Sequence, residues 1–347
     1  MALKYLEYEK AKTVKPEWLW PGFIRLGKVC LITGEGGVGK STLTYKLIAA
    51  VTTGAILPGQ DETNIKPSFC LVQNSEDEPF EDTLPQLKHF GADMGKVRSI
   101  EADGEPLTLL DPRFEEAVSE LGAKLLVIDP YTTFLGTSNM YSPQSIRSAL
   151  NRLQEIAQKY KCAVVLVGHI NKNEGAKSSN RHLGSSDIRH ALRTVLVVGR
   201  IDSNTYAIVP EKMSRGRRMK AIAFELSGVP EDENIVNLEW LGECEATADE
   251  LLNGSKSNGD CDSESFTPKI WPREIAKRFL LNTLSDTPTD KNDVVNAAAE
   301  HGIKEETLRR AREELGVIIE TRGNRSWWSL PQGVSAEIPN DATVDFE

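Results

Sequence analysis

The chain has 347 residues and a formal net charge of −10, with 39% hydrophobic and 27% charged residues. These proportions are typical of a soluble globular protein, and no run approaches the roughly 18 apolar residues that span a bilayer, which excludes a membrane-spanning protein. The acidic total argues against a protein coated in basic surface, and the length predicts one large domain with a smaller one.

Short apolar strands alternate with amphipathic helices from about residue 24 to residue 210. We predict strands at 28–33, 68–73, 124–129, 162–168 and 194–199, and helices at 40–53, 78–90, 112–121 and 143–160. This alternation predicts an α/β fold with a mostly parallel sheet and crossover helices. Beyond residue 200, the segments Thr205–Pro210 and Ala221–Leu226 suggest antiparallel strands that finish the domain.

The composition changes after the first domain, which we place at 1–245. Residues 246–267 are small, polar and rich in glycine and serine, so we expect a flexible linker. In 268–331, three helices precede two short strands, and Gly316 follows the third helix as a C-cap. This order predicts a winged helix-turn-helix. The acidic tail 332–347 is expected to be disordered.

The first strand leads into a glycine-rich loop and then a helix. The loop residues are Gly34, Glu35, Gly36, Gly37, Val38, Gly39, Lys40, Ser41 and Thr42, in the spacing of a P-loop. Its glycines let backbone N–H groups turn inward around phosphates, and the helix that follows directs its positive dipole end at them. Lys40 would reach the β- and γ-phosphates, and the Ser41 hydroxyl would bind Mg²⁺. The sequence therefore predicts an ATP and Mg²⁺ site.

Two further strands end in acidic residues. Asp129 closes the run Leu125-Leu-Val-Ile, at the sheet edge where open parallel sheets bind ligands, and it fits a Walker B carboxylate that holds Mg²⁺. Glu76 lies just past the strand 68–73, where a general base could meet a water near the γ-phosphate. Asp77 and Glu78 compete with it for this role, and a solvated acidic helix cap is the alternative for all three.

The fourth strand ends at His169, which could donate a hydrogen bond to the γ-phosphate or be purely structural. The segment 171–187 that follows is long and polar and contains Lys172, Lys177 and Arg181. Loops of this length inside a compact domain are usually functional.

Taken together, these motifs resemble those of the RecA-like ATPases of plasmids, phages and integrated elements, which include the plasmid RepA hexameric replicative helicases. The resemblance covers about 15–245 and rests on Gly-Glu-Gly-Gly-Val-Gly-Lys-Ser-Thr, Asn-Ser-Glu-Asp-Glu-Pro, Leu-Val-Ile-Asp-Pro and Val-Gly-His-Ile-Asn-Lys. It implies a RecA-like P-loop core with Glu76 as catalytic base, Asp129 as Walker B acid and His169 as γ-phosphate sensor.

The resemblance also implies a ring, with single-stranded DNA in its channel. The loop 171–187, with Lys172, Lys177 and Arg181, would contact this DNA. Each ATP site would lie between subunits of a homo-oligomer, a hexamer in the replicative helicases, and receive a basic finger in trans. Lys212 and Arg215 lie where that finger belongs, although the spacing departs slightly from those helicases and leaves Arg217 open. A solvated basic edge is the alternative for this segment.

The C-terminal helix-turn-helix-like segment resembles a small appendage often fused to such ATPases. It carries arginines suited to phosphate contacts: Arg309, Arg310 and Arg312 on its third helix, and Arg322 and Arg325 at the turn between its strands. Glutamates at helical spacing could neutralise the helix arginines, so a protein-docking role stays open.

These expectations support a DNA-dependent ATPase, a hexameric helicase or helicase-like motor in the replication of a mobile element. The alternative is an ATP-gated DNA-binding regulator or loader without unwinding activity. A P-loop small-molecule kinase is disfavoured, because no acceptor-binding lid is apparent. The N-terminus is charged too early for a secretory signal, and the five cysteines lack metal spacing. We therefore expect a cytoplasmic protein with reduced thiols.

Overall fold

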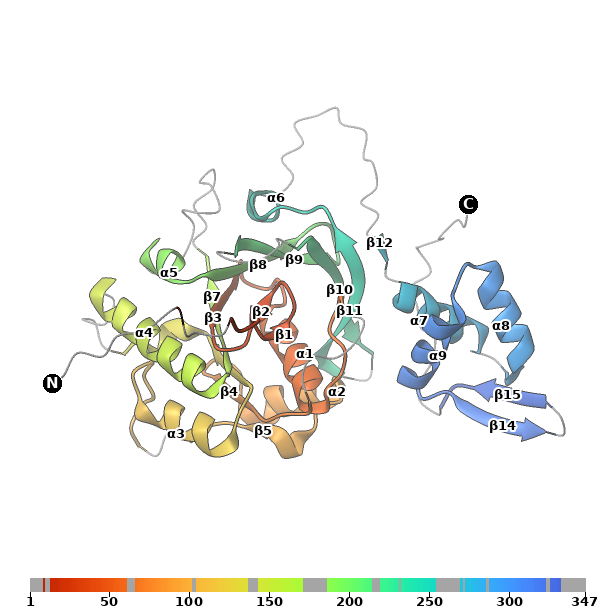
Figure 1. Ribbon diagram of the computed structural model, residues 1–347, viewed down its shortest axis with the longest axis horizontal. Helices are drawn as coiled ribbons and strands as arrows, with labels where there is room; N and C mark the ends of the chain where they lie inside the picture. The colour runs from red at the N-terminus through yellow and green to blue at the C-terminus, as the bar shows by residue number, and fades with distance from the viewer. Residues whose placement is uncertain are drawn as a thin grey trace, which may run out of the picture. The chain divides into compact units, whose positions relative to one another are not determined.

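The computed structural model describes residues 9, 13–60, 66–101, 104–136, 143–170, 186–213, 219–230, 232–253, 269–270, 272–284, 287–322 and 325–331. The chain forms two compact units (Figure 1). One comprises Met1–Glu239 and Cys244–Ser265, and the other comprises Trp240–Glu243 and Phe266–Glu347.

A mostly parallel sheet forms the centre of the first unit (Figure 1). Its strands, in spatial order, are β11 (Asp232–Cys244), β10 (Ala221–Val229), β9 (Thr205–Met213), β8 (Thr194–Arg200), β3 (Val29–Gly34), β7 (Ala163–His169), β6 (Leu125–Asp129), β4 (Cys70–Asn74) and β5 (Val97–Arg98). The pairs from β8 to β5 are parallel, whereas β9 is antiparallel to both β8 and β10. Continuous apolar runs suit these central strands because both faces of the sheet are covered.

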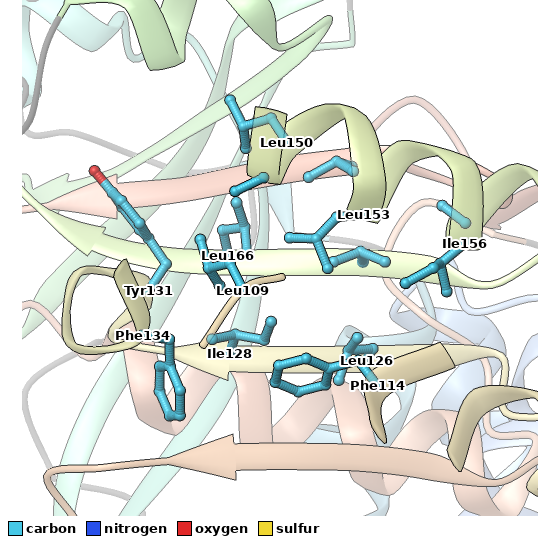
Figure 2. Packing of buried hydrophobic residues seen from close by; sticks show 14 of the residues in the cluster. Leu109, Phe114, Leu126, Ile128, Tyr131, Phe134, Leu150, Leu153, Ile156 and Leu166 are labelled. Atoms are coloured by element: carbon cyan, nitrogen blue, oxygen red, sulfur yellow. The ribbon is translucent and has the colours of Figure 1, made fainter. Parts of the chain in front are cut away.

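Helices cover the sheet, and a short hairpin, β1 (Trp18–Trp20) and β2 (Ile24–Arg25), precedes it. The helices of the first unit are α1 (Lys40–Thr53), α2 (Leu84–His89), α3 (Pro112–Leu121), α4 (Pro143–Tyr160), α5 (Ser186–Ala191) and α6 (Ala248–Asn253). Leu150, Leu153 and Ile156 of α4 pack over the strands β6 and β7, in a cluster that Phe114 of α3 completes (Figure 2). Burial of this helical stripe holds α3 and α4 against the sheet.

One predicted helix, 78–90, differs in the structure. Residues Pro79–Thr83 form a π-helical turn, η2, and α2 begins only at Leu84. Pro85 has no N–H, so it cannot donate the regular bond to the residue four positions earlier. Wider bonds form instead, from the N–H of Thr83 to the Glu78 carbonyl and from the N–H of Leu84 to the Pro79 carbonyl. Two 3-10 turns, η3 (Met94–Lys96) and η4 (Tyr131–Leu135), complete this unit.

The segment expected as a flexible linker also differs. Helix α6 occupies its first part, and Leu251 and Leu252 are buried. Thr247 and Glu250 cap α6 reciprocally, and a Cβ added at Gly199 of β8 would lie 2.6 Å from Leu251 Cβ. The glycine therefore permits the close approach of helix to strand. The rest of the expected linker, from 254 to 267, and the expected tail, 332–347, lie outside the described residues.

The second unit is a small helical domain with an antiparallel sheet. Its elements are β12 (Lys269–Ile270), α7 (Pro272–Thr283), β13 (Thr289–Asp290), α8 (Lys291–Glu300), α9 (Glu305–Glu314), β14 (Ile318–Arg322) and β15 (Arg325–Ser329). Its core joins Leu280, Val294, Leu308 and the indole of Trp328. Three helices followed by two strands is the predicted order, and the winged helix-turn-helix stays a prediction.

In the described part of the chain, no helix is both long and apolar enough to cross a membrane. Cys30, Cys70, Cys162 and Cys244 are buried free thiols, and burial raises the pKa of Cys162 to about 12. Cys261 lies outside the described residues.

Candidate active site

The loop after β3 is built for an anion. Gly37 and Gly39 have φ values of +75° and +79°, which favour glycine. A Cβ at Gly39 would lie 2.5 Å from Leu226 Cδ1, and one at Gly34 would lie 2.1 Å from the Val198 carbonyl oxygen. Helix α1 starts directly after Gly39 with no side-chain cap and no acidic residue in its first turn. Its leading N–H groups therefore suit a phosphate.

Lys40 lies beneath this loop with only 5% of its surface exposed. Its Nζ donates to the carbonyl oxygens of Gly34 at 3.2 Å and Glu35 at 2.6 Å, and lies 3.3 Å from His169 Nδ1. Burial lowers the pKa of Lys40 to about 8, although the nearby Asp129 carboxylate opposes this shift. A phosphate group would supply the anion that stabilises this buried ammonium.

Ser41 and Asp129 form the oxygen pair expected of a Mg²⁺ site. Ser41 Oγ donates to Asp129 Oδ2 at 2.7 Å, and Asp129 is 4% exposed. Burial raises the pKa of Asp129 to about 6, and the hydrogen bond from Ser41 partly offsets this effect. A hydroxyl and a carboxylate are hard oxygen donors, and Mg²⁺ is usually held by one or two such protein groups together with substrate phosphates. The residues present fit the ion.

The segment after β4 is fixed by Asn74. Its Oδ1 accepts hydrogen bonds from the backbone N–H groups of Glu76 at 2.8 Å and Asp77 at 3.0 Å. Its Nδ2 donates to Asp77 Oδ2 and to the hydroxyl of Tyr45, both at 2.9 Å. Tyr45, on α1, donates in turn to Asp77 Oδ2 at 2.6 Å. This network ties the acidic loop to the helix that follows the P-loop.

These contacts distinguish the three acidic candidates for the base. The Asp77 carboxylate is occupied by Tyr45 and Asn74, so it serves as a structural anchor. Glu78 is exposed, and its backbone N–H donates to Asp82 Oδ2 in the π-helical turn. The Glu76 side chain is 59% exposed, with Oε2 3.9 Å from His169 Nε2. This geometry favours Glu76, whose role as base stays a prediction.

His169 links Lys40 to Glu76. It ends β7 beside Gly34 of β3, its register partner. Burial and the Lys40 ammonium lower the pKa of His169. An ammonium can only donate, so Nδ1 of a neutral imidazole accepts from Lys40 and Nε2 carries the proton toward Glu76. His169 thus lies between Lys40 and Glu76, and its role as a γ-phosphate sensor stays a prediction.

Few of the expected trans-finger and DNA-loop residues are described. Lys172, Lys177, Arg181 and Arg215 lie outside the described residues, as does the alternative Arg217. Lys212 is half-buried on β9 and donates to the Arg189 carbonyl oxygen of its own chain at 2.6 Å. As a trans finger, this lysine would have to exchange that contact for a neighbour's phosphate.

Among the arginines that we expected to contact phosphates, two on α9 are paired with acids. Arg309 bonds both Glu306 and Glu313 at 2.7 Å, and Arg310 bonds Glu306 at 3.0 Å. These bonds lower the pKa of Glu306 to about 2. The glutamates anticipated from helical spacing thus neutralise much of the charge on α9. Such exposed pairs are weak, so phosphates could replace them.

The other three arginines expected to contact phosphates lie near the tryptophans or the turn. Arg312 lies over the Trp328 ring, and Arg322 pairs with Glu320 and lies over the Trp327 ring. Arg325 is exposed at the turn between β14 and β15. Trp328 is 2% exposed, so its ring packs inward.

Sequence reasoning missed Tyr45 and Asn74. The role of Asn74 could have been predicted, because asparagine side chains often accept hydrogen bonds from backbone N–H groups two and three residues later. Tyr45 carried none, since it lies in an apolar helix and its hydroxyl contact is visible only in three dimensions.

Replacing Tyr45 by Phe should loosen the acidic loop. We expect the maximal rate of ATP hydrolysis to fall about tenfold at unchanged KM, and the free energy of unfolding to fall by about 1–2 kcal/mol, because Asn74 and Asp77 each lose a partner. Single-turnover hydrolysis at saturating ATP and urea unfolding measure these changes. The control is Tyr160→Phe, which removes a hydroxyl bonded to Glu115 on α3. Equal hydrolysis by both variants would contradict the role of Tyr45.

One family model matches the part of the chain that contains the P-loop. Residues 6–175 match a model described as an AAA domain. The match covers just under half of the chain and includes Lys40, Glu76, Asp129 and His169. The sheet and its covering helices confirm the predicted α/β class with a mostly parallel sheet. The match supports a nucleotide-binding P-loop domain in this part of the chain, and the RecA-like core stays a prediction.

Curated proteins and solved structures were also compared with the chain. A comparison with curated proteins gave no match. Among solved structures, a KaiC-like protein from the hyperthermophilic archaeon Pyrococcus horikoshii OT3 is similar at 18% identity and a TM-score of 0.43, over 62% of this chain and 91% of that chain.

Proposed function

We propose that the chain is a DNA-dependent ATPase that acts as a hexameric helicase or helicase-like motor in the replication of a plasmid, phage or integrated element. ATP hydrolysis is supported by one observation: four candidate side chains lie together at the carboxyl edge of the sheet. They are Lys40, Asp129, His169 and Glu76. The resemblance to plasmid RepA-type helicases supports the motor.

Each residue has a defined role in this proposal. Lys40 and the N–H groups of the loop would hold the β- and γ-phosphates. Ser41 and Asp129 would hold Mg²⁺, which would supply positive charge to the phosphate oxygens. Glu76 accepts the proton of the attacking water. His169 would turn its Nε2–H from Glu76 to the γ-phosphate while Nδ1 keeps its contact with Lys40, and would turn back to Glu76 when that phosphate leaves.

A cation from a neighbouring subunit completes the site. Phosphoryl transfer spreads negative charge over the phosphate oxygens, which a single subunit with Lys40 alone would leave under-neutralised. Lys212 or Arg215 would supply this charge in trans, with Arg217 as the alternative. Lys172, Lys177 and Arg181 would contact single-stranded DNA in the channel of the ring.

A second function is favoured by one observation. Because Glu306 and Glu313 pair with the arginines of α9, the second unit presents less free positive charge than a dedicated DNA reader. This suits an ATP-gated regulator or loader in which the unit docks on a protein. The motor is the first proposal because the set of motifs resembles that of the plasmid RepA-type helicases.

Three measurements test these proposals. The first is ATP turnover with and without single-stranded DNA. The second is strand displacement on a forked duplex. The third is the mass of the assembly in the presence of an ATP analogue and single-stranded DNA. If DNA neither stimulates turnover nor is unwound, the motor is wrong. ATP-dependent DNA binding without displacement supports the regulator. A protein that stays monomeric removes the trans cation.

Replacing Lys40 by Ala should abolish turnover. We expect the rate to fall about 10²-fold or more, because the buried ammonium is the main positive charge at the phosphates. The control is Lys46→Ala on the same helix, whose ammonium lies over the Phe90 ring 4.6 Å from its centroid. A Lys40→Ala variant that still hydrolyses ATP at the wild-type rate would overturn the site.

A further inference from the structure

A row of basic residues lies at the amino end of the sheet, the edge opposite the P-loop. Arg193, Lys28 and Lys124 directly precede β8, β3 and β6, and Lys161 lies two residues before β7. These four strands are adjacent in the order β8, β3, β7, β6. We call Arg193, Lys28, Lys161 and Lys124 the basic row.

Backbone bonds fix the register of the row. The Lys28 carbonyl accepts from the N–H of Val164 at 3.1 Å, and the Lys124 carbonyl accepts from the N–H of Ala163 at 2.8 Å. Thr194, next to Arg193, is the register partner of Cys30. Neighbouring strands are about 4.8 Å apart, so the row extends over roughly 15 Å. One edge of the sheet thus carries four cations on four adjacent strands, staggered by one residue or more along the strand direction.

The charge of the row is poorly compensated. Lys161 Nζ lies 3.9 Å from Glu17 Oε1, with both side chains 55% exposed. Within the described ranges, no carboxylate pairs with Lys28, Lys124, Arg193 or the adjacent Arg25. Burial lowers the pKa of Lys28, and the charges of Arg25, Arg193 and Lys161 lower it further. Mutual repulsion of this kind, on a chain of net charge −10, is relieved by an external anion.

The surface fits phosphates better than a protein. Protein interfaces carry an apolar centre within a polar rim, whereas nucleic-acid backbones are bound by cations without one. The exposed large hydrophobic residues of the described chain are Val14, Phe80, Leu110, Ile318 and Ile319, and none belongs to the row. A group of cations spread along one sheet edge suits the repeating charge of a strand of nucleic acid.

We propose that the basic row is a second contact surface for the phosphate backbone of single-stranded DNA, outside the ATP site and outside the loop 171–187. The inference relies on the proposed function only for its choice of DNA as the partner. DNA that reaches this edge would contact the ATPase domain at the side remote from the phosphates of ATP.

The test compares two charge-matched double variants of the full chain. Lys28→Gln with Arg193→Gln removes two cations of the row, and Lys46→Gln with Lys88→Gln removes two lysines of α1 and α2. Binding of a fluorescent oligothymidylate is measured by anisotropy over a range of salt concentrations. In the row variant, we expect the slope of log K against log salt to shrink by about 1.4, because about 0.7 is lost per phosphate contact.

Stability and basal activity separate a binding role from a structural one. The urea midpoint of the row variant should equal or exceed that of the wild type, since the repulsion among Lys28, Arg193 and their cationic neighbours is reduced. ATP turnover without DNA should be unchanged. Lys124→Gln provides an independent variant, with an expected slope change of about 0.7.

The outcomes separate this inference from the proposed function. Equal slopes for the row variant and the control overturn the basic row and leave the ATPase intact. A reduced slope, with DNA that neither stimulates turnover nor is unwound, supports the row and overturns the motor. Displacement of the oligonucleotide by polyglutamate as readily as by unlabelled DNA, in the wild type but not in the row variant, would assign the surface to an acidic protein and overturn the proposal.

Discussion

Replacing Glu76 by Gln is expected to slow ATP hydrolysis by about 10²- to 10⁴-fold while nucleotide binding is preserved. The amide keeps the shape of the side chain but cannot accept the proton of water. The Asn74 bonds go to backbone N–H groups and to Asp77, so they leave the Glu76 carboxyl free and should survive the change. Binding of a fluorescent ATP analogue and single-turnover hydrolysis measure the two effects separately.

Two neighbouring carboxylates provide matched controls. Glu78→Gln should hydrolyse ATP close to the wild-type rate, because the described contacts of this residue are with the π-helical turn. Asp77→Asn should lose stability, since Asp77 Oδ2 accepts from both Tyr45 and Asn74, and should slow hydrolysis by about tenfold. If Glu78→Gln or Asp77→Asn instead loses more activity than Glu76→Gln, the base has been assigned to the wrong residue.

The sheet and its covering helices could be predicted because their sequence signals are local. Helices α1, α3 and α4 lie at the predicted residues, since each is bounded by a glycine, a proline or a capping aspartate. Ile146 and Leu150 recur at helical spacing, and both are buried. A short, continuous apolar run such as Leu125–Asp129 is typical of a strand in a sheet that is covered on both faces, so the sequence alone predicts it.

The remaining elements depended on contacts that local patterns do not contain. The bend at Pro79–Thr83 combines a proline effect with bonds to Glu78, and helix α6 depends on the space left by Gly199. The three acids after β4 look equivalent in sequence. Tyr45, 32 residues away on α1, distinguishes Asp77 from Glu76. The P-loop residues can be predicted from their spacing in the sequence. The choice among candidate bases depends on contacts that only the folded structure contains.

Replacing Asp129 by Asn should reduce ATP hydrolysis by about 10²-fold or more and yet stabilise the folded protein at pH 7. The carboxylate is buried and its pKa is raised to about 6, so its charged form is disfavoured in the folded state. Asparagine keeps an oxygen for the Ser41 hydroxyl but carries no charge. The gain should be about 1–2 kcal/mol, smaller than the pKa shift alone implies, because Lys40 loses an attractive neighbour.

The pH dependence gives this prediction its sign. Because the folded-state pKa lies above the unfolded one, the penalty from Asp129 is fully present above pH 6, and it diminishes as the pH falls toward 4. Urea unfolding of both proteins without nucleotide should therefore show a difference at pH 7 that largely disappears at pH 4. A variant less stable than the wild type at pH 7 would mean that Asp129 holds the fold together.

Asp111 supplies the opposite case on the same protein. It caps α3, and hydrogen bonds from Arg113 lower its pKa, so its charged form stabilises the fold above pH 4 and the effect is lost as the pH falls. Asp111→Asn should therefore weaken the protein slightly at pH 7, by under about 1 kcal/mol. Asp111 thus stabilises the fold in its charged form, whereas the charged form of Asp129 destabilises it. This difference is expected if Asp129 is placed to bind a metal ion and not to stabilise the fold.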